Sequence, residues 1–128
     1  MDKHILVFTT AGSKKEASKL SKGLVKKKLA YCVNTIPAVQ STYLWEDKLC
    51  IDDEFLLIIK TQGKKFTAVE AWILENHSYN VPEIIATPII QGSSDYLKCI
   101  DNWVDYLIRT IGVSNHEQSY FSEIVEYG

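Results

Sequence analysis

His77 lies near the middle of the sequence, directly after a stretch whose apolar spacing is typical of a helix. A neutral imidazole nitrogen is a good ligand for Cu²⁺, Zn²⁺ and Ni²⁺. The same ring at the end of a helix can instead donate to the last helical carbonyl groups and pack against the fold. His77 is therefore a candidate metal ligand, with helix capping and packing as the competing interpretation.

The sequence contains three cysteines, Cys32, Cys50 and Cys99. The Cys32 thiol, in an extended segment, is either a metal ligand or a small buried hydrophobic side chain. A nucleophilic thiol would require a base close by, and no Cys/His pair occurs locally. We expect Cys50 and Cys99 to be structural. An odd number of cysteines without a C-x-x-C motif is typical of a reducing compartment, so the predicted location is the cytosol.

Two further segments carry groups that could bind ions. Lys60 ends the apolar run 55–59, where an ammonium group is expected to pair with a carboxylate such as Glu83. The turn at Gly12 and Ser13 joins a predicted strand to a predicted helix, whose first N–H groups could hold an anion. No complete glycine-rich phosphate motif is present there. The acidic runs 46–47 and 52–54 are expected to form a solvated hairpin rim.

Alternating and helical periodicities predict the elements that position these groups. Each of the first two helices has a capping-box pattern, Ser13 with Glu16 and Thr67 with Glu70. Pro37 is expected at a bend or bulge of a long hairpin, and Gly112 is expected to stop the third helix. The predicted strands are 5–10, 32–45, 49–61 and 83–90. The predicted helices begin at Ser13, near Thr67 and at 91–94.

This order predicts an α+β fold, a ferredoxin-like βαββαβ sandwich with an added C-terminal helix. The expected domain covers 1–112, and 113–128 is an extension that we expect to dock, with Trp103 and Tyr120 against a neighbouring subunit. Both helices of such a sandwich cover one face of the sheet. Apolar residues at consecutive positions in 5–8 and 55–59 require burial on both faces, which predicts oligomerisation.

Composition excludes several classes of protein. With 128 residues, 46% hydrophobic content and a net charge of −2, the chain is expected to form one globular domain. No apolar run approaches the roughly 18 residues of a membrane helix, and no secretory signal is expected at the N-terminus. Residues 1–31 contain eight lysines, but the chain has a single arginine, Arg109, which argues against nucleic-acid binding. The run 26–28 is expected to be a solvated face that matches the helix dipole.

Several segments, in the right order over about residues 5–100, resemble the CutA family of divalent-cation tolerance proteins. They are Val7–Thr10, Leu24–Val25, Leu29–Asn34, Ile36–Lys48, Leu57–Thr61, His77–Ile85, Pro88–Ile89 and Tyr96–Leu97. The resemblance implies a homotrimer of ferredoxin-like subunits, similar to the PII signalling proteins. It also implies binding of divalent cations, copper above all, in a cleft between subunits, with no obligatory cofactor.

Site residues follow from the same resemblance. It implies a cleft lined by Tyr43, Trp45, Lys60, Tyr79 and Glu83. Metal ligands of the family correspond to positions 9, 76 and 77, where this chain has Thr9, Asn76 and His77. Cys32 lies within the family motif. His77 and Cys32 are therefore the candidate metal ligands.

We predict a cytosolic, trimeric metal-binding protein involved in the response to metal ions, and not an enzyme, because no triad, paired carboxylates or cofactor motif is present. One alternative is a PII-like sensor that binds a small anion through Lys60 and the Gly12–Ser13 turn. Another is a scaffold whose partners recognise the trimer surface. A thiol enzyme that uses Cys32 is the least favoured.

Overall fold

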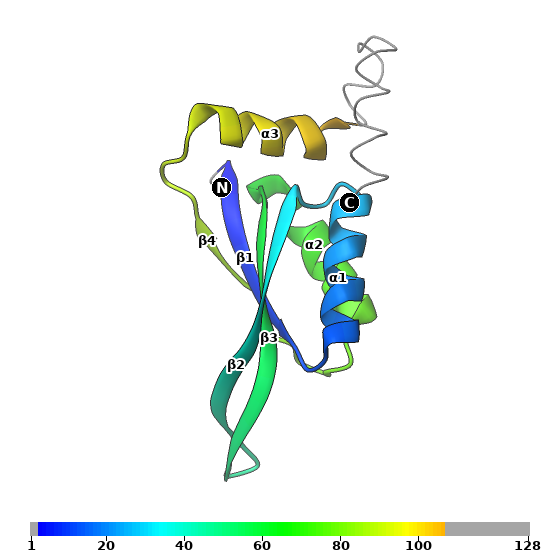
Figure 1. The fold of residues 1–128 in the computed structure, drawn as a ribbon, viewed down its shortest axis with the longest axis vertical. Helices are drawn as coiled ribbons and strands as arrows, with labels where there is room; N and C mark the ends of the chain where they lie inside the picture. The colour runs from blue at the N-terminus through cyan, green and yellow to red at the C-terminus, as the bar shows by residue number, and fades with distance from the viewer. Residues whose placement is uncertain (1–2, 107–128) are drawn as a thin grey trace.

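The computed structural model describes residues 3–106. They form a four-stranded sheet in the order β2-β3-β1-β4, in which all neighbouring strands are antiparallel. The predicted α+β order is confirmed. Figure 1 shows α1 and α2 packed on one side of the sheet and α3 across its end. The elements are β1 (His4–Ala11), α1 (Lys14–Lys26), β2 (Cys32–Trp45), β3 (Lys48–Gln62), α2 (Phe66–Asn76), β4 (Ile85–Pro88) and α3 (Ser94–Val104).

Helix α1 begins where its sequence predicts. The Ser13 side chain caps it by accepting a hydrogen bond from the Glu16 backbone N–H at 3.1 Å. The Glu16 carboxylate does not complete the capping box, because it reaches across to Ser78 instead. The apolar face of α1 is fully buried over the sheet and forms the main core. Its members there are Ala17, Leu20 and Leu24, opposite Val7, Leu57 and Ile59.

The start of α2 differs from the prediction. The helix begins at Phe66, after a short 3₁₀ turn (Gly63–Lys65), so Thr67 lies inside it and caps nothing. The predicted capping box of Thr67 with Glu70 was wrong because the 3₁₀ turn already supplies an acceptor, the Gly63 carbonyl, for the first helical N–H. Val69 and Ile73 are buried as expected.

The long hairpin of β2 and β3 turns at Glu46 and Asp47, whose positive φ angles of 50° and 62° are those of a tight two-residue turn. The expected irregularity at Pro37 is confirmed. The register shifts between Ile36 and Val39, and Ala38 has a φ of 60°. Two residues of β2 thus lie opposite one residue of β3, which is a bulge.

Strand β4 is shorter than the predicted 83–90, because it pairs only with residues 5–8 of β1. Helix α3, capped by Ser93, packs across the end of the sheet. Trp103 is 2% exposed and donates its indole N–H to the Val25 carbonyl, so its predicted packing on a neighbouring subunit was wrong. The predicted helix stop at Gly112, the extension 113–128 and Tyr120 lie outside the described residues.

The second face of the sheet is not covered by α1 or α2 (Figure 1). The strand register places Leu6, Phe8, Leu56 and Ile58 on that face, since Phe8 pairs with Ile58 and Leu6 with Lys60. Ile36, opposite Leu56, is 42% exposed. The described chain therefore carries an apolar sheet face that α1 and α2 leave partly exposed. Among the helices of residues 3–106, none could span a membrane.

Candidate functional site

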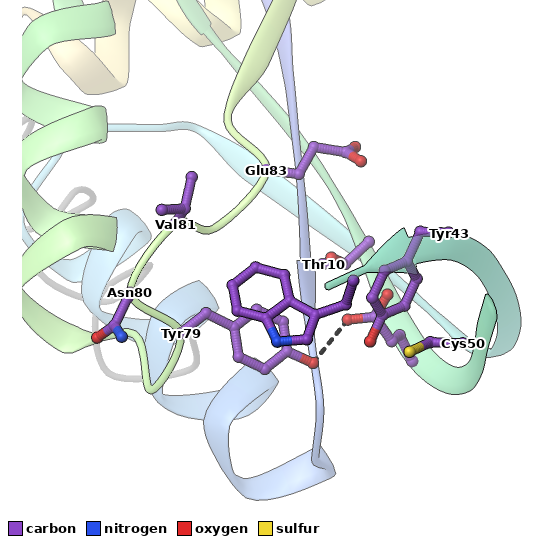
Figure 2. A pocket seen from close by; sticks show the side chains of 9 residues that line it. Thr10, Tyr43, Cys50, Tyr79, Asn80, Val81 and Glu83 are labelled. Carbon is purple, nitrogen blue, oxygen red and sulfur yellow. Dashed lines mark hydrogen bonds between the residues drawn. The ribbon is translucent and has the colours of Figure 1, made fainter. Parts of the chain in front are cut away.

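A cavity of about 430 Å³ lies where the β2–β3 hairpin meets the end of β1 and the loop before β4 (Figure 2). Four of the five residues that the resemblance assigns to a cleft between subunits line this cavity of a single subunit: Tyr43, Trp45, Tyr79 and Glu83. The other lining residues are Thr10, Cys50, Glu54, Asn80 and Val81.

Lys60, the fifth expected residue, lies elsewhere. It pairs with Leu6 and Cys32 in the sheet, and its ammonium nitrogen is 3.9 Å from the Cys32 sulfur. The predicted ion pair of Lys60 with Glu83 was wrong, because Glu83 precedes the short strand β4 at the cavity, whereas Lys60 is near the other end of the sheet. Lys60 therefore brings no positive charge to the cavity.

Tyr79 and Glu54 form a hydrogen-bonded pair in the cavity wall. The Tyr79 hydroxyl donates to Glu54 Oε2 at 2.7 Å, and Glu54 is only 7% exposed. Burial, the hydrogen bond and the charge of Glu54 together raise the pKa of the Tyr79 hydroxyl strongly, so Tyr79 remains a neutral donor. Its ring lies against Gly12, where an added Cβ would be 3.0 Å from the Tyr79 oxygen.

A second tyrosine–carboxylate pair lies further along the hairpin. The Tyr43 hydroxyl donates to Asp52, and this hydrogen bond is the main reason why the pKa of Tyr43 rises to about 12. Both tyrosine rings are thus tethered through their hydroxyl groups to carboxylates of β3. The run 52–54 is not simply the solvated rim we expected, because Asp52 and Glu54 are engaged with aromatic side chains.

The charge of the cavity wall is negative. Glu54 and Glu83 contribute carboxylates, and none of the lining residues in the described part of the chain is Lys, Arg or His. Within residues 3–106, the Glu83 carboxylate has no hydrogen-bond or ion-pair partner. The cavity therefore favours a cationic ligand over an anionic one.

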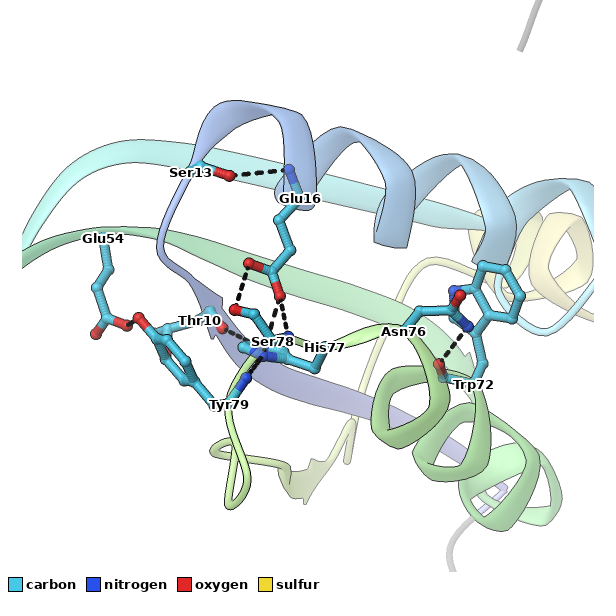
Figure 3. A network of polar contacts seen from close by, with 9 residues as sticks. All are labelled: Thr10, Ser13, Glu16, Glu54, Trp72, Asn76, His77, Ser78 and Tyr79. Atoms are coloured by element: carbon cyan, nitrogen blue, oxygen red, sulfur yellow. Dashed lines mark hydrogen bonds and ion pairs between the residues drawn. The ribbon is translucent and has the colours of Figure 1, made fainter.

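His77 does not line this cavity, and its side chain belongs to a polar network with Thr10, Glu16 and Tyr79 (Figure 3). Its side chain is fully buried, and Nε2 is 2.6 Å from the Thr10 carbonyl oxygen, so Nε2 carries the proton. Nδ1 is 3.1 Å from both the Tyr79 backbone nitrogen and Glu16 Oε1. A neutral ring accepts from Tyr79, and a protonated ring donates to Glu16; in either state both ring nitrogens face protein groups.

The predicted anion-binding turn belongs to the same network. Ser13 is used as the cap of α1, and Gly12 lies under the Tyr79 hydroxyl. The Glu16 carboxylate bonds to the Ser78 N–H at 2.6 Å and to the Ser78 hydroxyl at 3.0 Å. An anion at this turn would have to approach a carboxylate, which is electrostatically unfavourable.

Residues 5–103 match the family model of the CutA1 divalent ion tolerance protein. The chain belongs to the CutA family. It is 42% identical over 98 residues to the chloroplastic protein CutA of Arabidopsis thaliana, covering 77% of this chain and 54% of that protein. It is 40% identical over 102 residues to the divalent-cation tolerance protein CutA of Archaeoglobus fulgidus, covering 80% of this chain and 99% of that one. The chain thus spans about half the length of the plant relative.

Solved CutA structures share the fold. The periplasmic divalent cation tolerance protein CutA of Archaeoglobus fulgidus aligns with a TM-score of 0.77 at 40% identity, covering 79% of this chain and 98% of that one. CutA of Xylella fastidiosa aligns with a TM-score of 0.80 at 33% identity, covering 81% and 100%. The likeness extends over most of the described residues.

In this CutA chain, the two candidate metal ligands are not brought together. Cys32 lies opposite Lys60 of β3, whereas His77 bonds to Thr10, which lies opposite Leu56 of β3. Leu56 and Lys60 are four residues, or about 13 Å, apart along the strand. Within residues 3–106, no group of three or more His, Cys, Asp or Glu side chains is arranged to hold a metal ion. The donors of one described subunit therefore do not fit a tight metal site, and metal binding by His77 and Cys32 stays a prediction.

Glu54 and Cys50 are cavity residues that sequence reasoning missed. Residues 50, 52 and 54 of a strand share one face, and Cys50 lies opposite Tyr43 in the hairpin register. Period-two alternation in 50–54 could have placed a thiol and two carboxylates beside Tyr43. The alternation is hard to see in the sequence because Asp53, which faces the other side of the strand, makes 52–54 a continuous acidic run.

Proposed function

We propose that this CutA-family chain is a divalent-cation-binding protein, and not an enzyme, that holds its cation at the carboxylate-lined cavity. The observation that carries the proposal is the pair Glu54 and Glu83 in a wall without basic side chains among the described residues. Cys50 and the Asn80 amide are further donors in the same wall. Copper is the first metal to test, because Cu²⁺ binds a given set of N, O and S donors most tightly among the first-row divalent ions.

We further propose that the chain assembles as a homotrimer, and that neighbouring subunits complete the ligand set that one subunit lacks. Support comes from the partly exposed apolar sheet face, on which Ile36 is 42% exposed, since an exposed apolar patch marks an interaction surface. Ile36→Lys should weaken the assembly and so lower the molar mass of the particle measured by light scattering. Leu74→Lys, which changes a side chain that is 52% exposed on α2, is the control and should leave the mass unchanged.

The cation proposal is tested by calorimetric titration of Cu²⁺, Zn²⁺ and Ni²⁺ into the full chain. Glu83→Gln removes a carboxylate that has no partner in the described chain, and should weaken binding at least tenfold. Asp53→Asn is the matched control, because it changes the net charge equally on an exposed residue that does not line the cavity. Equal weakening by both variants would show that only net charge matters and would refute the site. His77→Ala and Cys32→Ser test the earlier ligand prediction in the same assay.

A small-anion sensor of the PII type is the weaker candidate, because Lys60 lies away from the cavity and Glu16 lies at the Gly12–Ser13 turn. The scaffold alternative would be favoured by partner capture that chelators do not affect. We propose the cytosol as the compartment, because Cys32, Cys50 and Cys99 are all free.

A further inference from the structure

Three aromatic rings stand around the cavity described above. In the single subunit, Tyr43, Trp45 and Tyr79 are 42%, 60% and 39% exposed, so part of each ring is open to a ligand. Figure 2 shows Tyr43 on the hairpin and Tyr79 in the loop before β4, on opposite sides of the cavity, and Trp45 of the hairpin also lines it. Aromatic side chains of this size are more often buried, and their gathering at one cavity beside carboxylates requires an explanation.

The tyrosine rings are held in place and enriched in electron density. Each hydroxyl donates to a carboxylate, Tyr43 to Asp52 and Tyr79 to Glu54. Donation to an anion makes the oxygen more electron-rich and so strengthens the negative potential on the ring face. A positive group over such a face is attracted by the ring quadrupole without any coordinate bond.

The size of the cavity favours an organic cation. Its volume of about 430 Å³ lies within the range of small-molecule pockets, about 300–1,000 Å³. A bare metal ion would leave the aromatic walls without a role, because phenyl and indole faces are not metal ligands. The Glu83 carboxylate, which has no partner within residues 3–106, lies in the wall as a counter-charge.

We propose that the cavity binds a small alkylated ammonium ion, with the cationic head against the faces of Trp45, Tyr43 and Tyr79 and with Glu83 as its counter-charge. This inference goes beyond the proposed metal binding, because the rings rather than the oxygen and sulfur donors recognise the ligand. The two ligands share only the carboxylates. They therefore exclude each other but depend on different side chains.

The test uses choline and its uncharged isostere 3,3-dimethylbutan-1-ol, which differ in one atom and one charge. Each is titrated into the full chain at constant ionic strength, and binding is followed by saturation-transfer NMR and calorimetry. We expect choline to bind at least fivefold more tightly than the isostere. Equal affinities, or no saturable binding of choline, would overturn the proposal.

Trp45→Leu is the decisive variant and should weaken choline binding at least fivefold. Leu44→Ala is its control, because Leu44 is the neighbouring residue on the same hairpin, is 70% exposed and does not line the cavity. If Leu44→Ala weakened choline binding as much as Trp45→Leu, the aromatic recognition would be refuted. Cu²⁺ binding should be unchanged by Trp45→Leu. The variant therefore distinguishes loss of the ammonium site from loss of the metal site.

Discussion

Gly23, in the last turn of α1, lies directly under the indole ring of Trp72 from α2. A Cβ added at position 23 would lie 2.0, 2.5 and 2.9 Å from three ring atoms, where ordinary contact begins at about 3.4 Å. The ring is also held by its N–H, which donates to the Leu20 carbonyl at 3.1 Å, and the Lys27 ammonium lies 5.1 Å from its centre. Gly23→Ala must therefore displace a ring that has specific partners.

The magnitude follows from two opposing effects. Where the added methyl group meets no neighbour, replacing Gly by Ala within a helix raises the free energy of unfolding by about 1 kcal/mol. Displacing the ring costs its hydrogen bond, about 1 kcal/mol, and much of its packing, about 3 kcal/mol by comparison with aromatic deletions. We expect Gly23→Ala to lower the free energy of unfolding by about 2–3 kcal/mol, against the sign of helix propensity.

The assay is urea unfolding followed by circular dichroism, with all variants at one protein concentration because assembly contributes to apparent stability. The control is the same substitution in a Trp72→Leu background. There the ring is absent, and Gly23→Ala should stabilise by about 1 kcal/mol. Stabilisation by Gly23→Ala in the unmodified chain, or the same sign in both backgrounds, would refute the packing argument.

Three further predictions concern single side chains. Tyr79→Phe removes the hydroxyl that donates to the buried Glu54 carboxylate, and should lower the free energy of unfolding by about 1.5–3 kcal/mol. Glu54→Gln in the same background should restore part of the loss. Ala38→Gly should stabilise by up to about 1 kcal/mol, because a φ of 60° is strained for alanine; a loss of stability would show that the bulge is not strained. Burial alone would raise the pKa of Asp101, but hydrogen bonds from Gln62, His4 and Lys3 outweigh it and hold that pKa below its ordinary value. A depressed carboxyl pKa stabilises the fold above about pH 4, and this contribution is lost as the pH falls further, so stability should decrease below pH 4 less steeply in Asp101→Asn.

Local patterns were sufficient for most of the fold. The Ser13 cap, the β-branched and aromatic residues of β1 and the turn between 45 and 48 depend on a few neighbouring residues, so they can be recognised in the sequence alone. The start of α2 could not be obtained in this way, because a 3₁₀ turn competes with the Thr67 cap and the two differ only in three dimensions. Local signals determine which element forms, while its exact limits depend on packing.

The candidate site was predicted less completely for a similar reason. The aromatic residues and Glu83 of the cavity had been singled out from the sequence, but the partner of each polar group depends on strand register. Glu16 was assigned to its own helix cap, whereas it bonds to Ser78 from a loop 62 positions later. Lys60 was assigned to Glu83, whereas the register places it beside Cys32. Long-range pairing of this kind has no short-range sequence signal.

The long hairpin has a consequence for how the cavity responds to its surroundings. Strand β1 pairs only with residues 55–62 of β3, so residues 39–45 and 48–54 form a two-stranded ribbon that extends past the helices (Figure 1). Such a ribbon is marginally stable by itself. One wall of the cavity therefore belongs to a well-packed body and the other to a segment whose ordering costs conformational entropy. A ligand in the cavity and a neighbouring subunit against the ribbon would each reduce the entropic cost that the other meets, so the two would bind cooperatively without touching.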